Sequence, residues 1–106
     1  MVEIIWTDTA IQDLNDIGEY INNDSPKYAE LTVSNLFNAP SILVHHPQSG
    51  KIVPEFASPS IRELIFGNYR IIYRIMNYEQ IDILTVHNCS RLIRNTIDFR
   101  EDDITT

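Results

Sequence analysis

The chain carries arginines and a histidine at a spacing that could serve an anion-binding or acid-base site. Arginine presents a rigid fork of N–H donors that fits carboxylate or phosphate. Histidine titrates closest to neutral pH, so His87 could act as a general acid beside an arginine that stabilises developing negative charge. The candidate binding residues are Arg62, Arg70, Arg74, His87 and Arg91.

Two interpretations of these residues stay open. Glu55 precedes the arginine-rich stretch and could be a general base if its segment folds over the arginines. Alternatively, the arginines are solvated strand residues paired with carboxylates, His87 is hydrogen-bonded at a strand end, and Glu55 is solvated. The carboxylates available for such pairs are Glu63, Glu79 and Asp82.

Cysteine and histidine usage predicts neither a metal site nor a cofactor. Cys89 is the single cysteine, so it cannot form an internal disulfide, and no Cys/His spacing resembles a zinc site. His45 and His46 are adjacent, and neighbours on a helix point in different directions, which makes them a poor metal pair. We expect Cys89 to be a buried or unreactive thiol.

The formal net charge is −7, from 15 acidic and 8 basic side chains. A protein that binds nucleic acid through phosphates is normally basic, so this charge argues against autonomous binding to DNA or RNA. Six of the 8 basic residues are arginines in the C-terminal 45 residues, so a local anion site could persist. No apolar run approaches the roughly 20 residues of a membrane span, and the start of the chain lacks signal-peptide features, which predicts a cytoplasmic protein.

The stretch from Ile61 to Arg74 must position the arginines, and its pattern predicts a β-hairpin. Two runs rich in β-branched and aromatic residues flank Gly67-Asn68, a pair suited to the positive φ angles of a two-residue turn. Side chains alternate across a strand, so one face is expected to hold Tyr69, Ile71, Tyr73 and Ile75. The other face is expected to hold Arg70, Ile72 and Arg74, and we group Arg62 with this arginine face.

Apolar residues at helical spacing predict two amphipathic helices before the hairpin. The first covers about residues 10–21. Ser25 as N-cap and Pro26 in the first turn begin the second helix, which Pro40 is expected to kink or restart near Asn38-Ala39. The short connection makes the pair an antiparallel helical hairpin.

Strands are predicted on both sides of these elements. Residues 2–6 form a first strand and residues 81–87 a last one. The proline-rich segment 46–60 is predicted to be a loop, with a brief edge strand at Ile52-Val53.

The C-terminal part completes the predicted domain. Residues 91–99 are expected to form a short helix and residues 101–106 a frayed acidic tail. The order β-α-α-β-β-β gives one α+β domain, residues 1–106, in which the helical hairpin packs on a small twisted antiparallel sheet.

Four ordered groups of residues, spread over positions 3–94, resemble the RelE/ParE toxin superfamily. The groups are Trp6, Thr7, Ala10, Asp13, Leu14, Ile17, Tyr20 and Ile21; Pro47, Gly50, Lys51, Pro54 and Glu55; Ile61 to Leu64 with Tyr69 to Arg74; and Val86, His87 and Arg91. The resemblance implies the same β-α-α-β-β-β fold that the periodicity predicts.

The resemblance also implies the toxin of a type II toxin–antitoxin pair. A cognate antitoxin would neutralise it by wrapping it with a disordered C-terminal segment, and an oligomer could form through that antitoxin. ParE-like members bind and inhibit DNA gyrase without known catalysis, whereas RelE-like members enter the ribosome and cleave mRNA. The fold alone cannot separate these activities. In a RelE-like enzyme the catalytic residues would be Glu55, Arg70, His87 and Arg91.

Departures from the RelE pattern favour the ParE-like interpretation. Ile61 and Glu63 stand where RelE members place lysines, no tyrosine follows His87 closely, and the net charge is −7. Arg62-Glu63-Leu64 and the Val86–Arg91 group resemble the ParE side. We therefore expect a gyrase-binding toxin, with an mRNA endoribonuclease or a non-toxic family remnant as alternatives. We expect the antitoxin to cover apolar surface on the helical hairpin or an exposed sheet edge.

Overall fold

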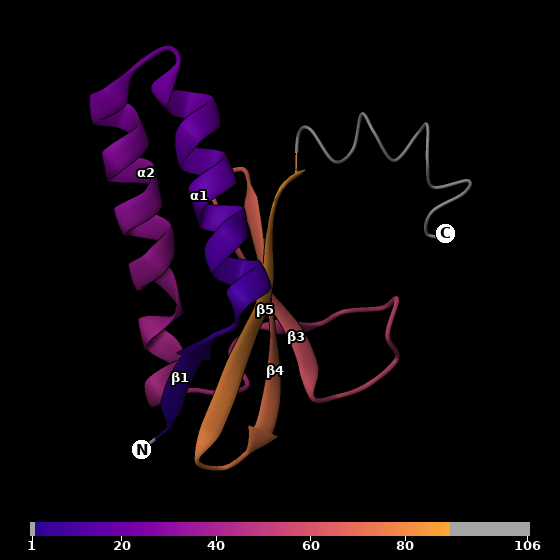
Figure 1. The fold of residues 1–106 in the computed structure, drawn as a ribbon. Coiled ribbons are helices and arrows are strands. Elements are labelled where there is room, and N and C mark those ends of the chain that lie inside the picture. The colour runs from indigo at the N-terminus through magenta and orange to yellow at the C-terminus, as the bar shows by residue number, and fades with distance from the viewer. Residues whose placement is uncertain (1, 90–106) are drawn as a thin grey trace.

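The structure, a computed structural model, describes residues 2–89. It has two layers, with the helices on one side of the sheet (Figure 1). In chain order the elements are β1 (Glu3–Trp6), α1 (Asp8–Asn22), α2 (Pro26–Asn38), a 3₁₀ helix (Ala39–Val44), β2 (Lys51–Ile52), β3 (Ile61–Phe66), β4 (Tyr69–Asn77) and β5 (Gln80–Asn88). The predicted α+β class and element order are confirmed, with β2 as the brief edge strand.

Within residues 2–89, five strands form one sheet in the order β1-β5-β4-β3-β2. The pairs β2–β3, β3–β4 and β4–β5 are antiparallel. β1 pairs with β5 in parallel, so the prediction of a wholly antiparallel sheet was wrong. Local sequence patterns could not set this pairing, because two α-helices and three strands separate β1 from β5, and so long a connection allows either direction.

α1 begins at a threonine cap that also fastens the helix to the sheet. The hydroxyl of Thr7 accepts a hydrogen bond from the backbone N–H of Ala10 at 3.2 Å and donates to the carbonyl oxygen of Ile83 at 2.7 Å. Such a cap stabilises a helix by about 1 kcal/mol. Ala10, Leu14 and Ile17 follow at helical spacing and are buried in the core shared with the sheet.

α2 begins and ends where the sequence predicted. The side chain of Ser25 accepts a hydrogen bond from the backbone N–H of Tyr28 at 3.2 Å, and Pro26 occupies the first turn. The α-helix stops before Pro40, and the 3₁₀ helix continues the chain. The predicted restart at this proline is therefore confirmed.

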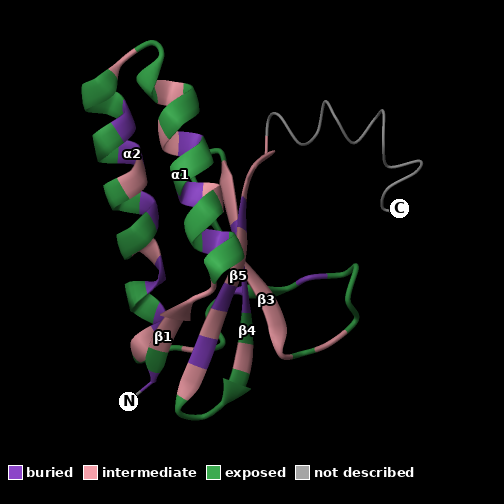
Figure 2. Ribbon diagram, in the orientation of Figure 1, coloured by how far each residue is buried: buried purple, intermediate pink, exposed green. Residues whose placement is uncertain are grey.

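The central strands carry the core beneath the helices. Gly67 adopts a φ of 60° in the predicted hairpin turn between β3 and β4. Ile71 and Tyr73 on β4 are fully buried, as are Ile81 and Ile83 on β5. Figure 2 shows buried residues along these strands and on the helices. The predicted core face of the hairpin is therefore confirmed.

Other predicted segments are shifted or fall outside the described range. The edge strand expected at Ile52-Val53 covers Lys51–Ile52. The predicted helix at 91–99 and the predicted tail at 101–106 lie outside the described residues. In the described part of the chain, no helix has both the length and the apolar character needed to cross a membrane.

Candidate functional site

The hairpin separates the predicted arginines onto two faces. Arg62 lies opposite Tyr73 in the β3–β4 register, and directly opposed residues share a face, so Arg62 belongs to the core-bearing face. Arg70 lies opposite Ile65 and shares the other face with Arg74. The expectation that Arg62 joins Arg70 and Arg74 on one arginine face was therefore wrong.

Arg62 binds backbone carbonyl groups. Its Nη1 donates to the carbonyl oxygen of Gly50 at 2.9 Å and to that of Gln48 at 3.3 Å. Its Nε donates to the carbonyl oxygen of Pro59 at 2.9 Å. These bonds tie the segments before β2 and before β3 to the hairpin.

The hydroxyl of Tyr73 binds the same segment before β2. Its hydroxyl donates to the carbonyl oxygen of Pro47 at 2.8 Å and accepts from the backbone N–H of Gly50 at 2.9 Å. Burial raises the pKa of the Tyr73 hydroxyl, although the Gly50 N–H and the charge of Arg62 act in the opposite direction. A Cβ at position 50 would lie 2.5 Å from the carbonyl oxygen of Glu63, so the site requires glycine. We call Gly50, Arg62 and Tyr73 the backbone clamp.

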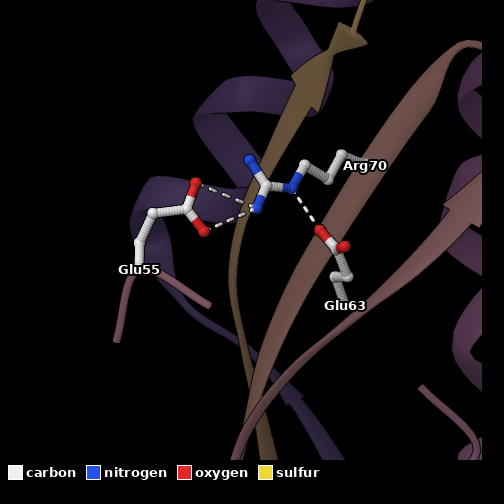
Figure 3. Close-up of polar contacts among 3 residues, drawn as sticks. All are labelled: Glu55, Glu63 and Arg70. Carbon is white, nitrogen blue, oxygen red and sulfur yellow. Dashed lines mark hydrogen bonds and ion pairs between the residues drawn. The ribbon is translucent and has the colours of Figure 1, made fainter. Parts of the chain in front are cut away.

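On the opposite face Arg70 binds two carboxylates (Figure 3). Its Nε donates to Oε1 of Glu63, and its Nη2 donates to the two oxygens of Glu55 at 3.2 and 3.4 Å. The side chain of Glu63 is 11% exposed and that of Glu55 is 52% exposed. Glu63 is therefore the sheltered partner and Glu55 the solvent-facing one.

The two carboxylates stabilise the charged form of Arg70. Burial by itself lowers the pKa of Arg70, but the hydrogen bond and charge of Glu63 and the charge of Glu55 outweigh burial and raise that pKa above its ordinary value. Because the Nε and Nη2 donors are occupied, a phosphate could reach them only by displacing a carboxylate.

His87 stands beside Arg70 on the neighbouring strand. The two residues are directly opposite in the β4–β5 register. Burial lowers the pKa of His87 below its ordinary value, the carboxylate of Asp13 opposes this change, and the charge of Arg70 adds to it. Asp13 on α1 accepts hydrogen bonds from the Thr85 hydroxyl at 2.6 Å and the Val86 N–H at 2.9 Å. Asp13 therefore supplies an acceptor to the part of β5 that does not pair with β1.

The structure brings together three of the four residues predicted for a catalytic set, namely Glu55, Arg70 and His87. The fourth, Arg91, lies outside the described residues. Arg74 is exposed on the same face as Arg70, farther along β4. We call Glu55, Glu63, Arg70 and His87 the arginine cluster.

Sequence reasoning named Glu63 only as one of several possible ion-pair partners, and it overlooked the clamp role of Arg62. The signal for both was present in the turn. A two-residue turn at Gly67-Asn68 pairs Phe66 with Tyr69, and counting outward places Arg62 opposite Tyr73 and Glu63 on the face of Arg70.

The charges of the arginine cluster limit its chemistry. Two carboxylates, those of Glu55 and Glu63, bind the one guanidinium of Arg70. Two further cations lie on the same face, namely Lys51, opposite Glu63 in the β2–β3 register, and exposed Arg74. A phosphate at Arg70 would therefore compete with carboxylates that are already bound there. Within residues 2–89, no cluster of three or more His, Cys, Asp and Glu side chains could hold a metal ion.

A second candidate surface lies between the helices. A groove of about 630 Å³ between α1 and α2 is lined by apolar side chains that include Leu14, Val33 and Phe37. Glu19 and Glu30 also line it, one from each helix. We call it the helix groove; its chemistry suits an apolar segment with basic flanks.

Sequence comparison identifies the family. Residues 4–93 match the model described as the ParE toxin of the type II toxin-antitoxin system parDE. The chain belongs to the ParE toxin family. It is 36% identical over 85 residues to Y4kP of Sinorhizobium fredii, covering 78% of this chain and 83% of that protein. It is 27% identical over 92 residues to Toxin RelE2 of Caulobacter vibrioides, covering 87% of this chain and 100% of that one.

Solved structures share the fold of this ParE-family toxin. A chain of the chromosomal ParDE TA system from P. aeruginosa matches with a TM-score of 0.69 at 23% identity, over 83% of this chain and 96% of that chain. A chain of the toxin–antitoxin complex RelBE2 from Mycobacterium tuberculosis matches with a TM-score of 0.54 at 22% identity, over 82% and 96%. The predicted RelE/ParE fold is confirmed, and it is common to both named systems.

Proposed function

We propose that this ParE-family toxin acts by binding and inhibiting DNA gyrase rather than by cutting RNA. The observation that carries the proposal is the occupied Arg70, whose Nε and Nη2 already bind the carboxylates of Glu63 and Glu55. A phosphate of mRNA would have to displace a carboxylate from Arg70, and the net charge of −7 also disfavours RNA. Gyrase works in the cytoplasm, where we place the toxin.

Ribosome-dependent mRNA cleavage is the second candidate. The convergence of Glu55, Arg70 and His87 favours it, because attack by a 2′-hydroxyl uses a base, an acid and a cation near the phosphate. The charge balance disfavours it, since the cation that would stabilise the transition state is already neutralised by Glu63 and Glu55.

Gyrase-catalysed supercoiling of relaxed plasmid tests the proposal. Purified toxin is added at increasing ratios to gyrase, at concentrations above the dissociation constant. We expect inhibition that is complete near equimolar toxin, because a binding inhibitor acts stoichiometrically. Full supercoiling at a large excess of toxin would contradict gyrase as the target.

We further propose that a cognate antitoxin neutralises the toxin by laying an amphipathic segment in the helix groove. The groove supports this proposal through its apolar lining and through Glu19 and Glu30, which favour lysine or arginine at the edges of the segment. A segment that folds on binding needs an apolar groove of this kind to offset its ordering.

Antitoxin affinity should depend on Phe37, which lines the groove and is 53% exposed. We expect Phe37→Ser to weaken binding by about tenfold or more, because anchor residues dominate such interfaces. Tyr28→Ser is the matched control, since Tyr28 is an exposed aromatic of α2 that does not line the groove. Calorimetric titrations in which both variants bind like the wild type would rule out the groove.

A further inference from the structure

The helix groove has two chemically different ends. Its middle is marked by Gly18 of α1 and Val33 of α2, since a Cβ at position 18 would lie 3.0 Å from Cγ2 of Val33. This close approach fixes the register of the two antiparallel helices, which lie side by side (Figure 1). An α-helix rises about 1.5 Å per residue, so positions along the groove can be counted from the Gly18–Val33 level.

Toward β1, the groove ends in apolar side chains. Leu14 and Phe37 line this end, each four residues and therefore about 6 Å from the Gly18–Val33 level. Trp6, at the end of β1, stacks on Phe37 with the ring centroids 5.2 Å apart. This end of the groove can therefore receive an apolar anchor of a bound segment.

Toward the connection between the helices, the groove is acidic. Glu19 and Glu30 line this end, and both lie within one helical turn of the Gly18–Val33 level. Both residues are exposed, and neither takes part in an ion pair among residues 2–89. One carboxylate on each helix favours a cation between them.

The charge of the two helices as a whole acts in the same direction. Between residues 8 and 38 the chain has one basic side chain and six acidic ones, namely Asp8, Asp13, Asp16, Glu19, Asp24 and Glu30. The basic residue is Lys27, which is exposed and does not line the groove. A segment bound in the groove therefore gains from positive charge.

We propose that the helix groove selects a helical antitoxin segment in which a lysine or arginine lies seven residues from an apolar anchor on the same face. The inference rests on the proposed antitoxin site and adds the pattern that the segment must carry. The acidic and apolar levels of the groove lie about 9 Å apart, and residues i and i+7 share one face of a helix at a spacing of about 10 Å. The cation then lies between Glu19 and Glu30 while the anchor contacts Phe37.

Two synthetic helical peptides of about 18 residues serve as probes, because shorter helices are marginal in water. Both have the same composition, the same leucine anchor and no tryptophan. One places its lysine seven residues from the anchor on the same face, and the isomer moves the lysine by two positions to another face. The fluorescence of Trp6, the single tryptophan of the toxin, reports occupancy beside Phe37. We expect the isomer to bind wild-type toxin about tenfold more weakly.

Variants of the toxin identify the groups that read the lysine. In Glu19→Gln/Glu30→Gln the two peptides should bind within about twofold of one another, and the cognate antitoxin should bind about tenfold more weakly than to the wild type. Asp16→Asn/Asp24→Asn is the matched control, since it removes two exposed carboxylates that do not line the groove. This control should keep the preference between the peptides.

The outcomes separate the inference from the proposal on which it rests. Cognate antitoxin that binds wild-type toxin and Phe37→Ser equally would overturn the groove as its site, and this inference with it. An antitoxin weakened by Phe37→Ser, with no preference between the peptides or with one that survives Glu19→Gln/Glu30→Gln, would overturn the inference alone. Toxin that is dimeric by light scattering, with the dimer lost in Phe37→Ser, would assign the groove to a second copy and also overturn the inference.

Discussion

Arg62 and Arg70 belong to one hairpin and bind unlike partners. Arg62 shares the core-bearing face with Tyr73 and donates to three backbone carbonyl groups. Arg70 faces away from the helices and donates to the carboxylates of Glu63 and Glu55. The first arginine fixes the shape of a loop, whereas the second holds a charged cluster at the surface.

The difference follows from strand parity and solvent access. On the core-bearing face, carbonyl groups that leave water need donors, so the backbone clamp contributes to stability. On the open face, Glu55 remains half in solvent, so the arginine cluster contributes less to stability and is available to a partner. Substitutions in the clamp should therefore lower the free energy of unfolding, and substitutions in the cluster should change binding.

Gly50→Ala should have the largest effect on stability. Its Cβ would lie 2.5 Å from the Glu63 carbonyl oxygen and 2.6 Å from the Tyr73 hydroxyl, so backbone must move and the clamp must open. We expect a loss of about 3 kcal/mol in the free energy of unfolding, measured by urea denaturation. Gly67→Ala is the control, since no atom lies near its Cβ and only its positive φ opposes the change, at about 1 kcal/mol. Equal losses in the two variants would show that the clamp is not tight.

Tyr73→Phe should come next. It removes the hydroxyl that joins Pro47 to Gly50 and leaves a buried backbone N–H without its acceptor. The expected loss is about 2 kcal/mol in the same denaturation experiment, with gyrase affinity unchanged once the protein is folded. A loss below 0.5 kcal/mol would place the Tyr73 hydroxyl outside the clamp.

Arg70→Met should lower the free energy of unfolding by less than the clamp substitutions do, and it should also weaken gyrase binding. The change strands Glu63, which is 11% exposed, so we expect a loss of about 1.5 kcal/mol. Adding Glu63→Gln to this variant should recover part of that loss, as a double-mutant cycle measures. Gyrase affinity should stay reduced in the double variant. A double variant that regains full affinity would show that Arg70 does not contribute to gyrase binding directly.

The pH dependence linked to His87 should be the smallest effect. Its folded pKa is lowered, so the unfolded chain binds a proton more readily, and stability falls as pH drops through about 6.5, the ordinary value. Below the folded pKa both states are protonated and the penalty stays constant. Denaturation at pH 7.5 and 5.5 should show a smaller pH-dependent loss in His87→Gln than in the wild type. Identical losses would contradict the burial of His87.

Local chemistry explains which parts of the fold could be predicted from the sequence. Ser25, Pro26 and the Gly67-Asn68 turn act through neighbouring residues, so their positions followed from sequence alone. The parallel pairing of β1 with β5 joins strands from opposite ends of the described chain, and no local pattern encodes it.

The candidate site was predictable in part for the same reason. Glu55 was expected to approach Arg70 only if its segment folds over the arginines, and the structure places it against Arg70, with His87 opposite Arg70 on the next strand. The pairing of Glu63 with Arg70 required the hairpin register as well as the residue types.

The most direct test of a binding rather than a cleaving toxin is mRNA cleavage on purified ribosomes. Wild-type toxin, Arg70→Ala and His87→Ala are incubated with programmed ribosomes, and cleavage is read by primer extension. We predict no cleavage by any of the three proteins, because the arginine cluster has no free cation for the phosphate. Cleavage by the wild type that disappears in both variants would contradict this account and identify the cluster as a ribonuclease site.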